Sequence, residues 1–484
     1  MKSIDDGSMT RRDFLRAAGV AAATVGVAGT LGAELAACGT DSTETTTTAG
    51  ATSTTSASAS STTAAAETTT TAEVTTTAGV EAGREVKVGI VAPITGTLAA
   101  FGGSTHWAID RWNEALAGGV VAGDGKNHPI KIVLMDTQSD SNRAGQVTGD
   151  LITNEKVDVV FSYGSPDTVL PSADQCEAAG VPSLSAFVPW QAFVFGRKGA
   201  PDKPFKWTYA LALGLDQIVG GYVDMFGKID TNKKVGLLFP NNADGMAWSD
   251  ETTGAPPIMK AAGYELVMPG LYPPGAEDYT TQVAAFKKAG CEVCCGALPT
   301  PDFTSFWRQS LQQGYKPKIM TAGLALGFPE SAVAVGPSVI GVTSELGWSP
   351  SWTFKSSLTG QTCQQLCDDY ETRTGHQWAA VLGAYALMEW YVDALKRAKD
   401  VDDKEACVAA IGTTKMQGAY GLIDFTVAPQ PGTVHPTANC YEPPTAGGQW
   451  RKGSKWPYDI IQVSNKFAPG TEAQDSVKPL AYDS

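Results

Sequence analysis

The sequence predicts an α/β protein with two lobes, each built on a mainly parallel β-sheet. From about residue 84 onward, short apolar or β-branched segments alternate with segments of helical spacing, and this alternation occurs in two successive series. Strands that are separated by helices pair in parallel through right-handed crossovers. The length of 484 residues is sufficient for two or three domains of roughly 150 residues each. We therefore expect two lobes with a cleft between them.

The first series of alternating segments accounts for the first predicted sheet. Its expected strands are 86–91, 130–134, 157–161 and 181–185. Its expected helices are 105–116, 144–154 and 171–179. Trp107 and Trp112 fall on apolar positions of the first of these helices, so we expect both side chains in the core.

The second series begins after Tyr209 and has a similar layout. Its expected strands are 234–239, 265–268, 292–298 and 318–321, and its expected helices are 255–262, 279–289 and 304–313. In open parallel sheets, ligands bind outside the carboxyl ends of the strands. We therefore expect the cleft to be lined by the loops after Val91, Phe161, Ser185, Phe239, Leu298 and Thr321.

Composition excludes several classes of function. The chain has 36 Lys and Arg against 50 Asp and Glu, a net charge of −14, which argues against nucleic acid as the main partner because phosphate binding needs a basic face. The four histidines are scattered and no HExxH motif occurs, so no metal site is expected. Neither GxSxG nor a phosphate-binding glycine loop is present. No catalytic residue and no cofactor is expected, and a hydrolase is disfavoured.

The N-terminus carries export signals. Arg11 and Arg12 are followed by Asp-Phe-Leu and a modest apolar run, the pattern of twin-arginine export. The run ends at Leu-Ala-Ala-Cys38, which resembles a bacterial lipobox, so residues 1–38 are interpreted as a signal peptide and Cys38 as a lipid anchor to the cell membrane. The alternative is an ordinary N-terminal helix with an incidental cysteine. Residues 39–83 are nearly all Thr, Ser and Ala and are expected to form a disordered tether.

The remaining cysteines are expected to form disulfides, with some free buried thiols, rather than a metal site. They are Cys176, Cys291, Cys294, Cys295, Cys363, Cys367, Cys407 and Cys440. No histidine lies near the Cys-x-x-Cys-Cys cluster, and export places the chain in an oxidising space. Cys294 and Cys295 fall on one predicted strand, so their side chains point to opposite faces. Eight cysteines allow 105 pairings, so no pairing is assigned.

A set of stretches, in order along the chain, carries a family resemblance. They are PITGTLAAFG at 93–102, DTQSD at 136–140, EAAGVP at 177–182, FKWTY at 205–209, DYTTQV at 278–283, FWRQ at 306–309 and GYKP at 314–317. This ordered set resembles the leucine/isoleucine/valine-binding proteins of ABC transporters, which have the type I periplasmic binding protein fold. The resemblance covers nearly all of the chain from Arg84 onward.

The resemblance implies an extracytoplasmic solute-binding lipoprotein that delivers a small molecule to the permease subunits of an ABC importer. It implies two Rossmann-like lobes joined by a three-segment hinge, with crossings near Tyr209, 341–346 and Tyr420. Lobe 1 is then 84–208 and 346–418, including a helix at 378–397. Lobe 2 is 209–345 and 419–484, and the closing strands 421–425 and 459–463 belong to lobe 2 or the hinge.

Other readings of the same fold remain open. The chain is expected to act as a monomer, and a ligand-sensing module used in signalling is the principal alternative function. A surface adhesin could use the same tether, but the two-lobe resemblance disfavours it.

The resemblance also implies a ligand site. Its expected residues are Phe101, Gly102, Ser165, Asp167, Ala186, Phe187, Asp244, Trp248, Leu298, Leu324 and Tyr385. Several positions depart from the family pattern. Pro166 aligns with a binding serine, Asp244 with a tyrosine, and the usual acid after the last cleft strand of lobe 2 is replaced within 322–324.

The departures change the expected ligand. A buried ammonium without a partner costs several kcal/mol, so an ordinary α-amino acid is disfavoured unless Asp167 or Asp244 pairs with it. We expect a solute with a flat or apolar body, held against aromatic walls, with its polar end at Ser165 and nearby N–H groups. The alternatives are that Asp244 simply caps the following helix and that the aromatic residues belong to the core or the rim.

Overall fold

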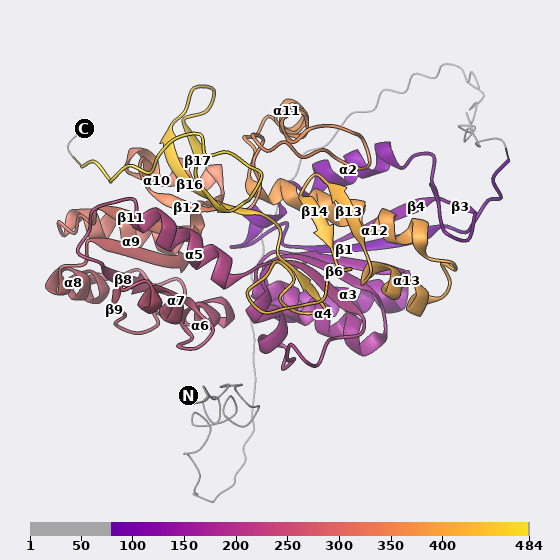
Figure 1. Cartoon of the computed structure of the whole chain (residues 1–484), viewed down its shortest axis with the longest axis horizontal. Coiled ribbons are helices and arrows are strands. Elements are labelled where there is room, and N and C mark those ends of the chain that lie inside the picture. The colour runs from indigo at the N-terminus through magenta and orange to yellow at the C-terminus, as the bar shows by residue number, and fades with distance from the viewer. Residues whose placement is uncertain (1–78, 483–484) are drawn as a thin grey trace, which may run out of the picture. The chain divides into compact units, whose positions relative to one another are not determined.

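The computed structural model describes residues 79–482. The expected signal peptide, Cys38 and most of the expected tether lie outside the described residues. None of the helices in 79–482 is long and apolar enough to cross a membrane. The described residues form two lobes, each containing a central sheet covered by helices on both faces (Figure 1).

The first lobe is built on a sheet with the strand order β15-β7-β6-β5-β1-β4, in which every pairing is parallel. The strands are β1 Val86–Ala92, β4 Ile130–Asp136, β5 Val159–Tyr163, β6 Ser183–Pro189, β7 Thr208–Leu213 and β15 Cys440–Tyr441. The helices are α2 Thr105–Ala115, α3 Ser141–Asp150, α4 Pro166–Ala179, α11 Cys363–Thr374, α12 Ala386–Arg397 and α13 Lys404–Ile411.

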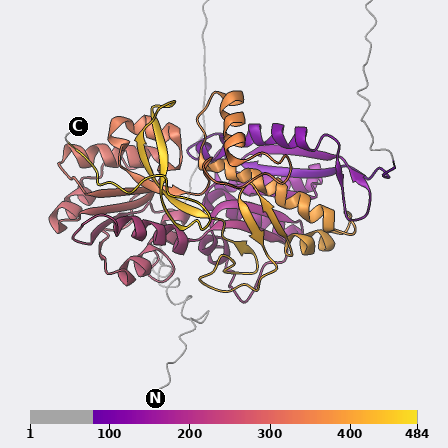
Figure 2. The ribbon, with the colours of Figure 1, turned by 45° about the horizontal axis from the view of Figure 1, so that its top comes forward.

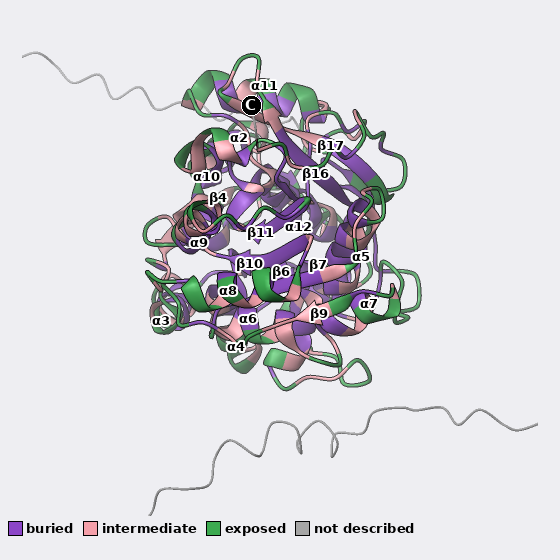
Figure 3. Cartoon of the chain, turned by 90° about the vertical axis from the view of Figure 1, so that its left-hand side faces the viewer, coloured by how far each residue is buried: buried purple, intermediate pink, exposed green. Residues whose placement is uncertain are grey.

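Neighbouring residues of β1 pack on opposite faces of this sheet. Ile90 belongs to the cluster that includes α2 and α12, whereas Val91 belongs to the cluster under α3 and α4. Trp112 is fully buried in the first cluster, against the rings of Phe161 and Tyr385. Both faces are covered, which is why the strands read as nearly continuous apolar runs in the sequence. Figure 3 shows the same division, with buried strands inside and exposed helix surfaces outside.

The second lobe is built on a sheet with the order β17-β16-β12-β11-β10-β8-β9. The strands are β8 Lys234–Leu238, β9 Glu265–Val267, β10 Val293–Leu298, β11 Ile319–Leu324, β12 Thr343–Leu346, β16 Thr445–Lys452 and β17 Tyr458–Phe467. β8 to β12 pair in parallel, and β16 and β17 extend the sheet in antiparallel fashion. The helices are α5 Leu215–Phe226, α6 Ala243–Ser249, α7 Ala255–Ala261, α8 Thr280–Ala289, α9 Thr300–Gln312 and α10 Pro329–Val335.

Within residues 79–482 the chain crosses between the two sheets three times. The first crossing is at Gly214, between β7 and α5, and the second is at Gly347, after β12. The third is at 442–444, between β15 in the first sheet and β16 in the second. In the turned view of Figure 2, the segment after the second crossing returns to the first lobe (orange) before the chain ends on the second lobe (yellow).

The observed crossings correct the expected boundaries. The prediction of a crossing near Tyr420 is wrong, because β13 Lys415–Gly418 and β14 Gly421–Asp424 form an antiparallel hairpin. Tyr420 and Phe425 are buried in the core of the first lobe, so 419–441 belongs there and the expected placement of the strand at 421–425 changes with it. β7 also stays in the first sheet, so that lobe extends past Thr208.

Two helices differ from their expected bounds. α4 begins at Pro166 rather than 171, because Ser165 caps it and proline suits the first helical position. The helix expected at 378–397 is a 3₁₀ segment, Ala380–Tyr385, followed by α12.

The eight cysteines of the described region do not form the expected disulfides. All eight are buried free thiols. Cys294 lies in the core between the sheet and α8–α9, whereas Cys295 lies in the core on the opposite face with α5 and α7. The alternation of side chains along β10 thus separates these two thiols.

Candidate ligand-binding site

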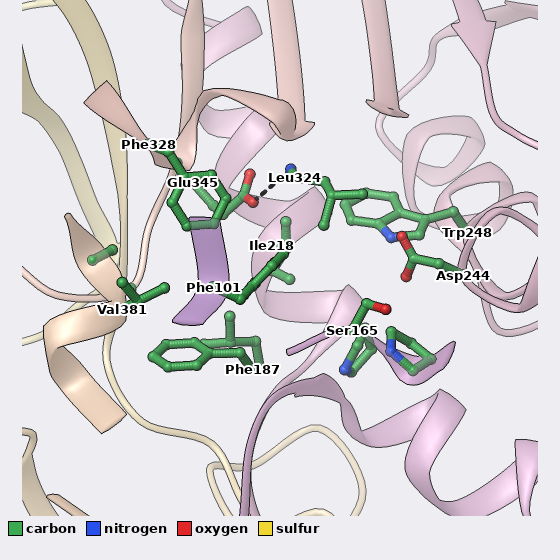
Figure 4. Close-up of a pocket in the computed structure, with 16 residues that line it drawn as sticks. Phe101, Ser165, Phe187, Ile218, Asp244, Trp248, Leu324, Phe328, Glu345 and Val381 are labelled. Carbon is green, nitrogen blue, oxygen red and sulfur yellow. Dashed lines mark hydrogen bonds between the residues drawn. The ribbon is translucent and has the colours of Figure 1, made fainter. Parts of the chain in front are cut away.

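A cavity lies between the two lobes (Figure 4). The lining residues of the first lobe are Phe101, Ser165, Pro166, Phe187, Pro189, Ala380 and Val381; those of the second are Ile218, Asp244, Trp248, Leu324, Gly327, Phe328 and Glu345; Leu213 and Gly347 adjoin the crossings. The cavity encloses about 670 Å³ of unfilled space, counting the part open to solvent.

The carboxyl ends of parallel strands position several residues of the cavity lining. Ser165 follows β5 and caps α4, Asp244 follows β8 in the first turn of α6, and Leu324 ends β11. This is the edge at which ligands of open α/β sheets bind. Because the two sheets present these edges to one cavity, a solute held there contacts both lobes at once.

Two non-glycine residues in the left-handed region also line the cavity. Phe187 has a φ of 60° and Leu324 a φ of 65°. In β6 the pairing with β7 shifts register between Ala186 and Pro189, around Phe187. Such conformations cost of order 1–3 kcal/mol each and cluster at functional sites. At Leu324 the backbone N–H donates to Glu345 Oε1 at 3.1 Å, which holds the strained residue in place.

Aromatic rings form the apolar wall. The Phe101 ring meets Phe328 edge-on, with centroids 4.9 Å apart, and lies 6.5 Å from the centroid of Phe187. Trp248 stacks between Tyr222 and Phe239, each at 6.0 Å. The stacking fixes the indole beside Asp244, where Figure 4 shows both side chains at one end of the cavity. This wall can hold a flat or apolar body.

Carboxyl groups give the site a polar, acidic part beside the aromatic wall. Asp244 is only 4 % exposed, and its pKa is raised to about 7, first by burial and then by the nearby charges of Asp167 and Glu345. A hydrogen bond with Trp248 opposes this increase. Burial also raises the pKa of Asp167, against hydrogen bonds from Ser165 and from the backbone N–H of Ala243. The last of these links the first lobe directly to the second.

Glu345 is a site residue that the sequence prediction missed. It lies within β12, and its carboxylate accepts hydrogen bonds from the Tyr222 hydroxyl and from Ser344 Oγ at 3.2 Å, besides the Leu324 N–H. The family's usual acid after β11 is absent from this chain, as expected, but the neighbouring strand β12 brings the carboxylate of Glu345 to the cavity. The available signal was a single acid inside an otherwise uncharged strand, Thr-Ser-Glu-Leu.

The expected site residues fall into three groups. Those that line the cavity are Phe101, Ser165, Phe187, Asp244, Trp248 and Leu324. Asp167 lies behind the wall, next to Ser165 and Asp244. Gly102, Ala186, Leu298 and Tyr385 are outside the cavity: Gly102 packs against the Pro93 backbone, Ala186 and Leu298 are fully buried in β6 and β10, and Tyr385 packs in the core against Trp107 and Trp112.

The hydrogen bonds at the starts of α4 and α6 bear on the expected roles of Ser165 and Asp244. Asn242, and not Asp244, caps α6, because its side chain accepts from the Gly245 N–H at 2.9 Å. The Ser165 hydroxyl already accepts from the Asp167 N–H at 3.3 Å. The sequence also gave no indication that Ile218, Phe328 and Val381 line the cavity, since none directly follows a strand.

Residues 79–482 contain no group of three or more His, Cys, Asp or Glu side chains arranged to hold a metal ion. The cavity therefore offers shape, aromatic surface and carboxyl groups as its means of recognition.

The sequence profile of one protein family, described as periplasmic binding protein, matches residues 85–441. The chain belongs to this periplasmic binding protein family. A second profile, described as the TAT signal of the ubiquitinol-cytochrome c reductase Fe-S subunit, matches residues 1–31. That match agrees with the twin-arginine pattern of the N-terminus and with an extracytoplasmic binding protein.

Curated relatives and solved structures are similar to most of the described chain. The Leu/Ile/Val-binding protein homolog 7 of Brucella suis is 25% identical over 355 residues, 68% of this chain and 84% of the relative. A leucine-binding protein of Thermotoga maritima has a TM-score of 0.62 at 19% identity, covering 79% of this chain and 99% of that protein. An ABC-transporter solute-binding protein of Rhodopseudomonas palustris, in complex with 3,4-dihydroxybenzoic acid, has a TM-score of 0.63 at 18% identity, covering 81% and 99%. These likenesses show the predicted type I fold.

Proposed function

We propose that this periplasmic binding protein captures a small organic solute in the cavity between its lobes and delivers it to the permease subunits of an ABC importer. The observation that carries the proposal is that both lobes line one cavity at the carboxyl edges of their sheets. A solute that bridges the lobes stabilises the closed form, because a ligand shifts a conformational equilibrium only by binding one form better. The solute leaves the site chemically unchanged.

The ligand that fits the cavity has an apolar or aromatic body and is not a simple branched-chain amino acid. The curated relatives are named for leucine, isoleucine and valine, and one structural neighbour binds an aromatic acid. In this chain, Phe101, Phe187 and Phe328 supply a broad ring surface. Ring contacts of this kind contribute about 0.5–1.5 kcal/mol beyond simple burial of apolar area.

Membrane attachment is part of the proposal. Acylation of Cys38 after removal of 1–37 anchors the protein to the outer face of the cell membrane, and 39–83 tethers the monomeric two-lobe domain. Replacing Cys38 with Ala is expected to release the protein into the soluble fraction and to abolish incorporation of radiolabelled palmitate. Retention of label and membrane location in the variant would contradict the anchor.

The binding proposal is tested by ligand screening. The full-length protein is screened by thermal shift against amino acids, aromatic acids, amines and neutral aromatic compounds, and hits are titrated by calorimetry. We expect at least one solute to bind with 1:1 stoichiometry and to lose affinity on Phe101→Ala, whereas Val333→Ala, an exposed site on the second lobe, leaves affinity unchanged. A hit whose affinity does not change in the Phe101 variant would place the binding site elsewhere.

A further inference from the structure

We propose that the solute of this cavity is a cation: an amine, amidine or guanidine with an apolar or aromatic body and no carboxylate. The inference rests on the proposed function, since it assumes that the cavity is the ligand site. Three independent features of the described residues lead to it: the charges around the cavity, the use of the nearby N–H donors, and the aromatic wall.

The charges around the cavity have one sign. Asp244 and Glu345 line it, and Asp167 lies directly behind Ser165 and Asp244. No Lys, Arg or His of residues 79–482 is among the lining side chains. An anionic ligand would place another negative charge beside buried Asp244 and partly buried Asp167 and Glu345 without a compensating cation, which is costly in a low-dielectric site. A cation would instead pair with them.

The N–H donors in the first turn of α4 are already used. The first turn of a helix is the usual place for such an anion, and α4 begins at the cavity. Pro166 has no N–H, the Asp167 N–H donates to Ser165 Oγ at 3.3 Å, and the Thr168 N–H donates to the Ser165 carbonyl at 3.1 Å.

Two backbone N–H groups of the second lobe near Asp244 and Glu345 also interact with carboxylates of the protein itself. The backbone N–H of Ala243 interacts with the Asp167 carboxylate, and the Leu324 N–H donates to Glu345. At these two N–H groups, an acidic ligand or the acid group of an amino acid would have to displace a carboxylate of the protein. This differs from the expectation that Ser165 and adjacent N–H groups bind the polar end of the ligand.

The aromatic wall suits the remainder of a cationic ligand. In Figure 4, Asp244 and Val381 lie at opposite sides of the cavity, with Phe101 between them. A cationic head between Asp244 and Glu345 would extend its body along Phe101 and Phe187. The faces of Phe and Trp rings also attract cations, most strongly when water is excluded.

A matched ligand series tests the charge directly. Phenethylamine, phenylalanine, 3-phenylpropionamide and 3-phenylpropionate share one body and differ in head group. Titrated into the full-length protein at about pH 7.5, together with benzylamine, benzamidine and benzoate, the cations are expected to bind at least tenfold more tightly than the acids, and the zwitterion in between. A tenfold ratio corresponds to about 1.4 kcal/mol.

Variants locate the effect in the cavity. Asp244→Asn and, separately, Glu345→Gln are expected to weaken binding of the amine by roughly tenfold or more, because each removes a charged partner, and to leave any binding of the neutral amide nearly unchanged. The matched control is Asp202→Asn, an exposed acid in the first lobe, which should not alter amine affinity. Because the series itself uses wild-type protein, it does not depend on the folding of a variant.

The outcomes separate this inference from the proposed function. Binding of an acid or amino acid more tightly than the matched amine, with loss of affinity in Phe101→Ala, overturns the cationic ligand while leaving solute capture intact. Amine binding that is unchanged in both acid variants overturns the assignment to Asp244 and Glu345. Failure of every compound in the broad thermal-shift screen counts against solute capture and the inference together.

Discussion

Replacing Asp244 with Asn is expected to stabilise the empty protein while weakening its binding of an amine. The carboxyl is 4 % exposed, Glu345 in the cavity lining and Asp167 behind it are two further acids, and no cation of the described residues lines the cavity. The pKa is consequently raised from 3.8 to about 7. The ionised Asp244 side chain thus lowers the stability of the folded, empty protein, and a neutral residue of nearly the same shape does not.

The sign and size of this cost follow from proton linkage. Below about pH 4 the carboxyl is protonated in both folded and unfolded chains, so it costs nothing. As the pH rises, the unfolded chain releases the proton first, and stability falls until the folded carboxyl ionises near pH 7. The increase in the pKa of Asp244 from 3.8 to about 7 lowers the free energy of unfolding by about 4 kcal/mol above pH 7. At pH 5 the same increase lowers it by about 1–2 kcal/mol.

The assay compares wild type and Asp244→Asn by denaturant unfolding at about pH 5 and pH 8, without ligand. The variant should be more stable at both values, with the larger difference at pH 8, and the control Asp202→Asn should show no such trend. A variant that is less stable than wild type at pH 8, or a difference that does not grow with pH, would refute the reasoning about buried like charges.

Three further outcomes are expected. Phe101→Ala should weaken binding of any cavity ligand by roughly tenfold or more in calorimetric titration, because the ring contacts both Phe187 and Phe328, and unchanged affinity would contradict its place in the wall. Glu442→Gln should raise the unfolding temperature at pH 8 but not at pH 4. Burial and then Asp216 raise the pKa of Glu442, so this carboxyl destabilises the folded protein only at pH values above the ordinary pKa of Glu. Equal effects at both pH values would count against this explanation. Thiol titration of a Cys38→Ala protein, in denaturant without reductant, should detect all eight cysteines from Cys176 to Cys440, and fewer reactive thiols would reveal disulfides.

The alternation of strands and helices could be predicted from the sequence because both faces of each sheet are covered. Residues of β1 such as Val88 and Val91 are buried on opposite faces, so the strand reads as a continuous apolar run. The third crossing could not be predicted in the same way. A local pattern identifies 421–424 as a strand, but only tertiary packing shows that it pairs with 415–418 in the first lobe.

The residues of the candidate site likewise differ in whether local sequence or tertiary packing reveals them. Ser165, Asp244 and Leu324 could be found because each lies just after a strand or at its carboxyl end, where the topology alone predicts the cleft. Glu345 and Phe328 could not, since their place in the cavity depends on how β12 and the segment after β11 pack between the lobes. Tyr385 is one of the residues expected in the ligand site, but it is buried in the core against Trp112 and does not line the cavity.

A crystal structure of the protein with the tightest-binding compound from the solute screen tests solute capture most directly. We predict electron density for one solute between the lobes, in contact with Phe101 and with a head group facing Asp244 and Glu345. Density for the bound compound at any other place, with the cavity between the lobes empty, would contradict it.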